Sequence, residues 1–307
     1  MNESILITGA NIGLGKETAR QLALKKETKK IILFCRNQAK AEAAKKDLEE
    51  KTGKKIFEII IGDVSDANSV RRAVEKITEP IDAIILNAGG MVGKTAGKIT
   101  PSGMNELAAT NILGHVILVE ELIKVGKIKK TVLLASSEAI PGVRALGMKP
   151  VAMKTSSVDE FAAVLDGSYF GDKFDPMQAY GYVKYVATMW LFSMARKYPE
   201  LKFVAMSPGN TAGTQAPDTI AQPMKFMVTC IMMPIVMPLM GVVHKLEVGA
   251  KRFVDGISDE RYKSGIFYAS KEGKLTGAVV DQGTFFVDLK NNSFQENADR
   301  AIHRFIK

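Results

Sequence analysis

The sequence predicts an α/β fold with a doubly wound parallel sheet. Apolar stretches of strand length alternate with helical stretches from residue 4 to residue 135, and turns rich in small residues follow two of the strands. Alternating strands and helices form a parallel sheet with helices on both faces. Because ligands of such sheets bind at the carboxyl ends of the strands, functional residues are expected there.

The first unit contains a glycine-rich turn between a strand and a helix. Residues 4–8 form the expected strand, residues 9–15 read GANIGLG, and residues 16–26 form the expected helix. Glycines let phosphate oxygens approach backbone N–H groups at a helix N-terminus, where the helix dipole favours negative charge. The spacing G-x-x-x-G-x-G differs from the G-x-G-x-x-G fingerprint of long-chain dinucleotide enzymes, and a turn used only for tight packing is equally compatible with it.

The second and third strands end in residues that could contact a dinucleotide. The strand at residues 30–34 is followed by Cys35, Arg36 and Asn37, with no acid to hold ribose hydroxyls. A basic residue there suits a 2′-phosphate, so Arg36 favours NADP over NAD unless it is an ordinary surface arginine. A helix at 38–51 and a strand at 55–61 lead to Asp63, which could accept a hydrogen bond from an adenine amine or cap the next helix.

Small and polar residues also follow the next two strands. A helix at 66–78 and a strand at 82–86 precede the turn Asn87-Ala88-Gly89-Gly90, and a strand at 131–135 ends in Ser136 and Ser137. Between these strands Asn111 stands in an otherwise apolar helical stretch, where a buried amide needs hydrogen-bond partners. Either serine could reach a site at the strand ends.

Tyr180 and Lys184 form a candidate acid–base pair. At i and i+4 on a helix their side chains share one face, so the lysine charge can lower the tyrosine pKa from its usual value of about 10. Two neighbours on a solvated helix face are the ordinary alternative, because this spacing is common by chance. Tyr182 is a second phenol, but it points away from the face of Lys184.

Seven sequence elements together resemble the short-chain dehydrogenase/reductase superfamily over about residues 4 to 270. They are Thr8-Gly9-x-x-x-Gly13-x-Gly15, Asp63-Val64, Asn87-Ala88-Gly89, Asn111, Ser137, Tyr180-x-x-x-Lys184 and Pro208-Gly209, in this order along the chain. The resemblance implies a single domain with a Rossmann-like doubly wound parallel sheet of about seven strands and helices on both faces. It also implies hydride transfer between a nicotinamide and a carbonyl or alcohol.

The resemblance assigns a role to each matching residue. Tyr180 would exchange a proton with the substrate oxygen, and Ser137, favoured over Ser136, would bind the same oxygen. Lys184 would lower the Tyr180 pKa and bind the nicotinamide ribose, and Asn111 would hold a water that relays protons to Lys184. Residues expected to contact the cofactor are Gly9, Asn11, Ile12, Gly13, Leu14, Gly15, Arg36, Asp63, Val64, Asn87, Ala88, Gly89, Pro208, Gly209, Thr211 and Thr214.

An insertion at residues 138–178, just before Tyr180, departs from the superfamily pattern. Its run Asp166-Gly167-Ser168-Tyr169-Phe170 is similar to the branch of protochlorophyllide reductases and retinol-dehydrogenase-like enzymes, as is the run at residues 208–214. Segments of this length beside a site are usually functional or disordered. Only the layout of that branch carries over, since nothing in the sequence specifies a tetrapyrrole substrate.

A second departure is the uncharged stretch at residues 226–243, within a lid expected at residues 212–245. Its length would admit a membrane span, but Pro234 and Pro238 interrupt it and both flanks are needed for one globular fold. We expect a lid over an apolar substrate, with peripheral membrane contact as the alternative and a true span least favoured. Its five methionines would let a pocket adapt to several shapes or would fill a core.

The remaining chain returns to regular elements. A helix at 246–256 and a strand at 265–269 are expected, and this strand would be the last of the sheet. Residues 271–307 extend beyond the usual end of the superfamily, and Ser293 and Glu296 have capping-box spacing for a short helix that runs to Ile306. The extension is expected to pack against the lid or a second subunit.

Composition favours a reduced, intracellular protein. The formal charge of +9 is spread over lysine pairs without a basic stripe interleaved with aromatics, so no nucleic-acid partner is expected. Cys35 and Cys230 lack metal or redox spacing, and no basic-then-apolar leader precedes the first strand. No second ligand stands near His115, His244 or His303 in the sequence, so no metal site is expected. A cytoplasmic location fits these observations.

The predicted function is that of an NADP-dependent oxidoreductase acting on a small hydrophobic carbonyl or alcohol. A cofactor-binding regulator or scaffold without turnover is the alternative, which the joint presence of Asn111, Ser137, Tyr180 and Lys184 disfavours. The resemblance also allows a homodimer through the helix that bears Tyr180, although the insertion before it could block that contact. Membrane association through residues 226–243 stays open.

Overall fold

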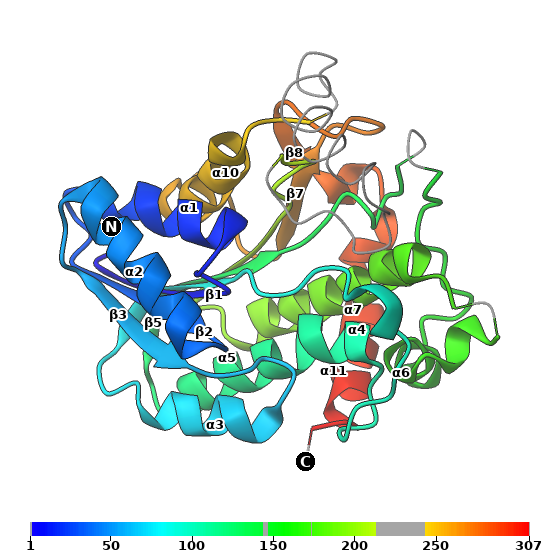
Figure 1. The fold of residues 1–307 in the computed structure, drawn as a ribbon. Coiled ribbons are helices and arrows are strands. Elements are labelled where there is room, and N and C mark those ends of the chain that lie inside the picture. Colours follow the sequence, from blue (N-terminus) through cyan, green and yellow to red (C-terminus); the bar gives the residue numbers. More distant parts are fainter. Residues whose placement is uncertain (1, 144–146, 173, 213–242, 307) are drawn as a thin grey trace, which may run out of the picture.

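A single twisted sheet lies between two layers of helices in the computed structural model, which describes residues 2–143, 147–172, 174–212 and 243–306 (Figure 1). The strand order is β3-β2-β1-β4-β5-β6-β7-β8. The strands are β1 Ser4–Thr8, β2 Lys30–Cys35, β3 Phe57–Ile61, β4 Ile81–Leu86, β5 Ile128–Ala135, β6 Lys202–Met206, β7 Ile266–Ser270 and β8 Val279–Asp281. Strands β1 to β7 are parallel, and β8 pairs antiparallel with β7. The expected Rossmann-like sheet is confirmed.

Helices cover both faces of this sheet. The α-helices are α1 Gly13–Ala23, α2 Gln38–Thr52, α3 Ala67–Glu75, α4 Glu106–Ala108, α5 Gly114–Lys124, α6 Val158–Asp166, α7 Pro176–Lys197, α10 Leu246–Ser258 and α11 Asn292–His303. Figure 1 shows α1, α2 and α10 on one face and α3, α5 and α7 on the other. Side chains of a strand alternate between faces, so Ile5 and Ile7 join the core beneath α1 and α10 whereas Leu6 joins the core beneath α5 and α7.

Short helical turns complete the described chain. A π-helix at Ala109–Leu113 joins α4 to α5, and 3₁₀ turns occur at Gly93–Thr95, Ser168–Phe170, Gln282–Thr284 and Val287–Lys290. The expected apolar helix around Asn111 is therefore interrupted by one wide turn. Such π-bulges occur frequently at functional sites.

The insertion and the C-terminal extension are both ordered over their described residues and both pack on α7. Helix α6 of the insertion and helix α11 of the extension contact α7 and each other (Figure 1). Tyr169 and Phe170 of the insertion stack on Tyr182, and both the Tyr169 and the Tyr182 hydroxyl groups donate to the Ala152 carbonyl oxygen. Tyr182 therefore faces the insertion, as expected from its place on the helix.

Several expected boundaries and caps were wrong. Strand β7 is not the last of the sheet, because β8 of the extension pairs with it. Asp66, not Asp63, caps α3, since its carboxylate accepts hydrogen bonds from the first-turn N–H groups of that helix. Helix α11 is capped by the Asn291 side chain rather than by Ser293, and it ends at His303 rather than at Ile306.

No helix among the described residues is both long enough and apolar enough to cross a bilayer. The apolar stretch at residues 226–243 lies outside the described residues except for Val243, as does most of the lid expected at 212–245.

Candidate active site

The glycine-rich turn after β1 leads into the N-terminus of α1. This helix begins at Gly13, three residues earlier than expected, so Gly13 and Gly15 lie in its first turn. Ile12 occupies the cap position without a side-chain hydrogen bond, and the first turn contains no acid. A Cβ built on Gly15 would lie 2.5 Å from the Gly9 carbonyl oxygen, so only glycine permits this close approach. An uncapped helix N-terminus of this kind suits an anion such as a pyrophosphate.

Hydrogen bonds join this turn to the turn that follows β4. The backbone N–H groups of Asn87 and Ala88 both donate to Thr8 Oγ1 at 2.9 Å, and Asn87 Nδ2 donates to the Thr8 carbonyl oxygen at 2.9 Å. The Cys35 thiol accepts from the N–H groups of Ala10 and Asn11, and burial raises its pKa to about 11. Sequence reasoning missed this role of Cys35, which no spacing rule would have revealed.

Arg36, Asp63 and Val64 lie at the carboxyl ends of β2 and β3. Arg36 is exposed and forms no ion pair with any residue that the structure describes. Asp63 is half-buried, and its Oδ1 accepts from the Ser65 N–H at 2.9 Å and the Ser65 hydroxyl at 2.7 Å. The Val64 carbonyl oxygen accepts from the Gly114 N–H at 2.8 Å, so this segment contacts the end of the π-helix.

Ser137 and Tyr180 meet at the carboxyl end of β5. The Ser137 hydroxyl lies close enough to the phenol to lower the Tyr180 pKa, but burial raises that pKa more strongly and brings it to about 12. Ser136 is 3% exposed, and its hydroxyl lies 2.9 Å from the Thr188 hydroxyl. The two serines therefore point to different places, and it is Ser137 that lies beside the phenol.

Lys184 lies on the same face of α7 as Tyr180. Its Nζ is 5.6 Å from the centroid of the Tyr180 ring and donates to the Ala135 carbonyl oxygen at 2.9 Å. Burial lowers the pKa of Lys184 to about 8. The expected lowering of the Tyr180 pKa by Lys184 is not found in this structure, because the ammonium is held over the ring and on Ala135, and burial controls the pKa of the phenol.

Asn111 is fully buried in the π-helix, and its side-chain amide forms hydrogen bonds with the protein backbone. Its Nδ2 donates to the carbonyl oxygens of Gly90 and Leu107 at 3.0 and 2.8 Å, and its Oδ1 accepts from the Gly90 N–H at 3.0 Å. These bonds fix the turn after β4.

His115 is a buried residue of this region that sequence reasoning did not place. Its Nδ1 lies 3.2 Å from the Asn111 carbonyl oxygen and its Nε2 lies 3.0 Å from Thr8 Oγ1. A carbonyl oxygen only accepts, so Nδ1 carries the proton and Nε2 accepts from the Thr8 hydroxyl. Burial lowers the pKa of His115 to about 3, which keeps the ring neutral.

The turn after β6 carries Pro208, Gly209 and Thr211. The Thr211 hydroxyl lies 3.1 Å from the Pro208 and Gly209 carbonyl oxygens, and His244 Nε2 donates to the Pro208 carbonyl oxygen at 2.7 Å. The fold brings this turn to the same sheet edge as Ser137, because β5 and β6 are adjacent and parallel. Thr214 lies outside the described residues.

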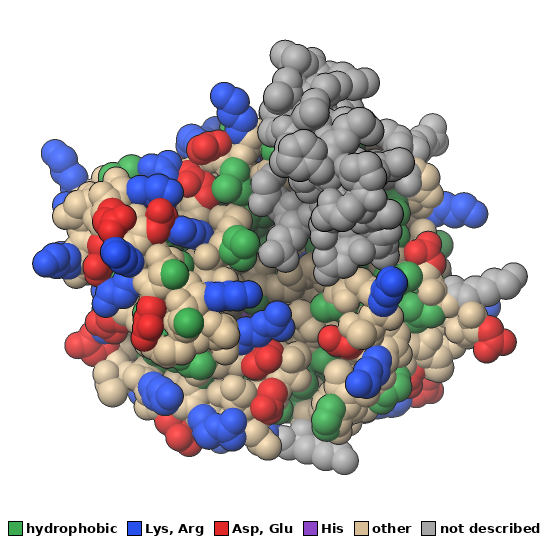
Figure 2. Space-filling model, in the orientation of Figure 1, with side chains coloured by type: hydrophobic (Ala, Val, Ile, Leu, Met, Phe, Trp, Pro, Cys, Tyr) green, Lys and Arg blue, Asp and Glu red, His purple; other side chains and the backbone are tan. Residues whose placement is uncertain are grey.

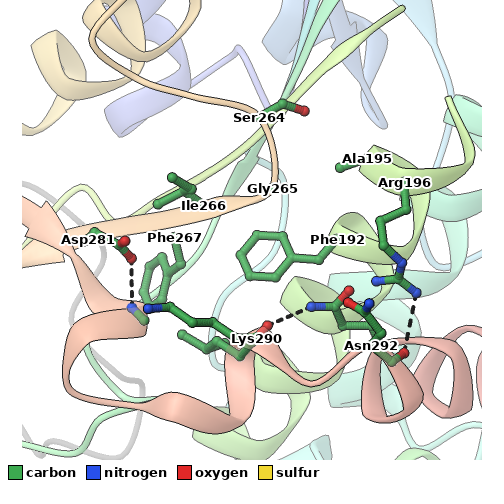
Figure 3. Close-up of a pocket in the computed structure, with 13 residues that line it drawn as sticks. Phe192, Ala195, Arg196, Ser264, Gly265, Ile266, Phe267, Asp281, Lys290 and Asn292 are labelled. Carbon is green, nitrogen blue, oxygen red and sulfur yellow. Dashed lines mark hydrogen bonds between the residues drawn. The ribbon is translucent and has the colours of Figure 1, made fainter. Parts of the chain in front are cut away.

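A pocket among the described residues lies away from these strand ends. A cavity of about 390 Å³ opens between the C-terminal half of α7, β7 and the C-terminal extension (Figure 3). Phe192, Arg196, Phe267 and Lys290 are among the residues that line it, whereas Ser137, Tyr180 and Lys184 are not. The space-filling view instead shows a hollow on the face in front of the strand ends, with Lys and Arg side chains beside it (Figure 2).

His303 has two neighbouring acids that the sequence did not reveal. Ligand atoms of Glu120, Asp299 and His303 lie within 4.8 Å of one another. The expectation of no second ligand near a histidine was therefore wrong at this position. Hydrogen bonds to Asp299 and Glu120 raise the His303 pKa to about 10, so the ring is a protonated partner of the two carboxylates.

Comparison with known proteins identifies the family. A model of the short chain dehydrogenase family matches residues 3–156, half of the chain. The chain belongs to the short-chain dehydrogenase family. Dehydrogenase/reductase SDR family member 12 of Bos taurus is 28% identical over 208 residues, which cover 67% of this chain and 60% of that protein. Retinol dehydrogenase 13 of Homo sapiens is 35% identical over 124 residues, which cover 39% of this chain and 36% of that protein.

Solved structures of the family share the fold at low identity. An NADPH-bound carbonyl reductase from chicken fatty liver superposes with a TM-score of 0.58 at 18% identity, over 90% of this chain and 99% of that chain. A 3-ketoacyl-(acyl-carrier-protein) reductase from Brucella melitensis, complexed with NADH, gives a TM-score of 0.53 at 18% identity, over 84% of this chain and 91% of that chain. At this identity the likeness concerns the fold alone.

Proposed function

We propose that the protein is an NADP-dependent oxidoreductase that interconverts a small hydrophobic carbonyl and the corresponding alcohol. The observation that carries this proposal is the proximity of the Ser137 hydroxyl to Tyr180, with the buried Lys184 ammonium over the Tyr180 ring, at the sheet edge that also bears the glycine-rich turn. Membership of the short-chain dehydrogenase family supports it. A proton donor, an oxygen-binding hydroxyl and a buried cation in one place suit carbonyl reduction.

The residues of this chain have distinct tasks in that reaction. Ser137 donates to the carbonyl oxygen and fixes its position beside the Tyr180 hydroxyl. Tyr180 gives its proton to that oxygen in reduction and takes it back in oxidation, and its high pKa keeps it protonated at neutral pH. Lys184 supplies positive charge as Tyr180 loses its proton. The hydride is supplied or received by the nicotinamide when the cofactor is bound.

The strand ends fit a nicotinamide dinucleotide. The uncapped N-terminus of α1 would hold the pyrophosphate, Asp63 would accept from the adenine amine, and Lys184 would bind the nicotinamide ribose. The exposed Arg36, with no ion-pair partner among the described residues, supports NADP over NAD, since its charge suits a 2′-phosphate. Solved relatives include both NADPH-bound and NADH-bound proteins, so Arg36 decides the preference in this proposal.

A hydrophobic substrate is supported by the relatives and by the insertion. Two human relatives carry the names of a retinol dehydrogenase and a steroid reductase, and the insertion places Tyr169, Phe170 and Phe174 near the N-terminal part of α7. Retinal is therefore the first aldehyde to assay. A lid or peripheral membrane contact through residues 226–243 remains part of the prediction.

Substitution of the phenol tests the proposal. Tyr180→Phe removes the proton donor and keeps the ring, so turnover of NADPH with retinal or another apolar aldehyde should fall about 10²- to 10⁴-fold. Tyr182→Phe is the matched control, because the Tyr182 hydroxyl bonds to Ala152 of the insertion rather than to Ser137 or Lys184, so turnover should stay near wild type. Near-normal turnover in Tyr180→Phe would refute the proposal. NADPH binding without turnover in the wild type would favour a cofactor-binding regulator.

A further inference from the structure

A buried ion pair lies directly behind the proposed catalytic residues. Glu138 follows Ser137 in the chain, Arg252 lies on α10, and their side chains are 10% and 7% exposed. Arg252 Nη1 lies 3.4 Å from Glu138 Oε1. Burying two charges is expensive, and removing one leaves the other without a partner. The pair lies where it can control the position of Ser137.

The Glu138 carboxylate connects the carboxyl ends of three neighbouring strands. It accepts a hydrogen bond from the Ser207 hydroxyl after β6, and bonds of 3.3 and 3.1 Å from the N–H and hydroxyl of Ser270 at the end of β7. Glu138 itself follows β5, so one side chain fixes the ends of β5, β6 and β7 relative to one another. Ser137 and the Pro208-Gly209 turn begin at two of these ends.

The Arg252 guanidinium reaches the Pro208-Gly209 turn and the C-terminal extension. Its Nη1 donates to the Ser207 carbonyl oxygen at 3.1 Å, and its Nη2 donates to the Ser270 hydroxyl at 3.0 Å and the Gly277 carbonyl oxygen at 2.9 Å. A Cβ built on Gly209 would lie 2.8 Å from Nη1, so the guanidinium touches that turn.

The extension makes a second contact with the same segment. The Leu275 carbonyl oxygen accepts from the Asn210 N–H at 2.9 Å, two residues before Gly277 receives its bond from Arg252. Residues 275–277 therefore touch both the turn that follows Gly209 and the arginine behind it. This gives the extension a place beside the site, not only on the far side of α7.

We propose that Glu138 and Arg252 are positioning residues for the reaction. They hold Ser137 and the Pro208-Gly209 turn in place relative to each other, and Arg252 also attaches the C-terminal extension to this turn. The proposal rests on the proposed function. The planar fork of arginine makes bonds in three directions here, which the single ammonium of lysine does not reproduce.

The charged groups around Tyr180 come from several elements. Lys184 lies on α7, Glu138 follows β5, and Arg252 reaches Glu138 from α10. Burial is the main cause that raises the Tyr180 pKa, and the Glu138 charge raises it further. His244, beside the same turn, has its pKa lowered by burial and is neutral at pH 7. Removing the Glu138 charge should therefore lower the Tyr180 pKa and move the pH dependence of turnover.

Three variants and one control test the proposal. The variants are Glu138→Gln, Arg252→Lys and the double variant Glu138→Gln with Arg252→Met. The control is Arg261→Met, which removes an exposed ion pair with Asp259 at 2.6 Å. For each protein the measurements are kcat and KM for NADPH and retinal or the best apolar aldehyde, the pH profile of kcat, NADPH affinity by fluorescence, and the thermal midpoint.

The variants have distinct expected results. Glu138→Gln leaves Arg252 as an uncompensated cation, so kcat should fall about tenfold with a smaller change in KM, and the basic limb of the kcat profile should move about one unit to lower pH. Arg252→Lys keeps the charge, so it should lower kcat without moving the profile. The double variant also lacks the Glu138 charge, so its kcat should fall and its basic limb should lie at lower pH than in the wild type, moved no further than in Glu138→Gln. Arg261→Met should match the wild type throughout.

The outcomes that overturn the proposal are separate from those that overturn the proposed function. Wild-type kcat and pH profile in Glu138→Gln and Arg252→Lys would overturn it. A lower thermal midpoint with an unmoved profile in Glu138→Gln would do the same, because a purely structural pair behaves so. If the wild type binds NADPH without turnover, the proposed function is overturned but the positioning role of the pair is not. NADPH affinity then tests whether the pair positions the site, because Arg252→Lys should weaken NADPH binding about tenfold relative to Arg261→Met.

Discussion

Lys184 carries its positive charge in a buried environment, where a charged side chain is destabilising. The residue is 3% exposed, its ammonium donates to the Ala135 carbonyl oxygen, and burial lowers its pKa to about 8. A methionine would bury a stem of similar length without the charge. We expect Lys184→Met to leave the thermal midpoint unchanged or raised while turnover falls about 100-fold or more. Calorimetry and kinetics on one preparation check this, and a large fall in the midpoint would contradict it.

Arg36 is the residue on which the cofactor preference depends. A charge-assisted hydrogen bond contributes about 1.5 to 3 kcal/mol, so Arg36→Ala should weaken NADPH binding roughly 10- to 100-fold. NADH has no 2′-phosphate, and its affinity should stay within about twofold of wild type. Fluorescence titration of both cofactors measures this, with Arg261→Ala as a control for loss of surface charge. An unchanged ratio of NADPH to NADH affinity would remove Arg36 from the proposal.

Among the elements, those with local signals could be predicted and those fixed by distant contacts could not. Strands β1 to β5 and β7 are apolar runs followed by turns, and each was placed to within a few residues, whereas no bounds were predicted for β6. Strand β8 has three half-buried residues and exists because it pairs with Tyr268–Ser270, a contact that no local pattern encodes. The α11 cap depends on the extended backbone of Asn291, since Ser293 is also a capping residue type.

In the candidate site too, residues with a local sequence signal could be predicted and residues held by distant contacts could not. The helix spacing predicted that Tyr180 and Lys184 share a face, and the resemblance to the superfamily predicted that Ser137 joins them. The bond from Arg252 to Glu138 joins residues 114 positions apart, and neither residue belongs to a motif. The protein's own bonds to the Asn111 amide and the position of Lys184 on Ala135 likewise depend on tertiary packing, so only the structure could show them.

Helix α11 is anchored to α5 by His303. Its Nε2 lies 3.0 Å from Glu120 Oε2 and its Nδ1 lies 3.3 Å from Asp299 Oδ1, and hydrogen bonds to Asp299 and Glu120 raise its pKa to about 10. The folded pKa lies above the unfolded value of about 6.5. The stabilisation is therefore complete below pH 6.5 and is lost as the pH rises toward 10.

Amide hydrogen exchange of α11 measures this anchor. After correction for intrinsic rates, protection of α11 should be lower at pH 9 than at pH 6 in the wild type. His303→Gln cannot be protonated in this range, so its α11 should show the weaker protection at both pH values. Helix α10, on the opposite face of the sheet, is an internal control. An identical pH response of α11 in wild type and variant would rule out the anchor.

At the scale of the whole molecule, the chain encloses the helix through which many superfamily members dimerise. The buried residues of α7 extend from Ala179 to Met194, and α6 and α11 lie against the helix on the side away from the sheet (Figure 1). Arg196 of α7 also forms a 3.2 Å ion pair with Glu296 of α11. A dimer through α7 would have to displace α11, which costs the burial of Ala298, Ala301 and Ile302.

We therefore expect a monomer rather than the homodimer that the resemblance allows. Light scattering after size exclusion, with NADPH present to stabilise the folded state, should give a mass near 33.4 kDa at all protein concentrations tested. A mass twice as large would contradict the expectation. Cross-links would then tell whether α7 lies at the interface with α11 displaced, or whether the two copies meet through another surface and leave the packing of α11 on α7 intact.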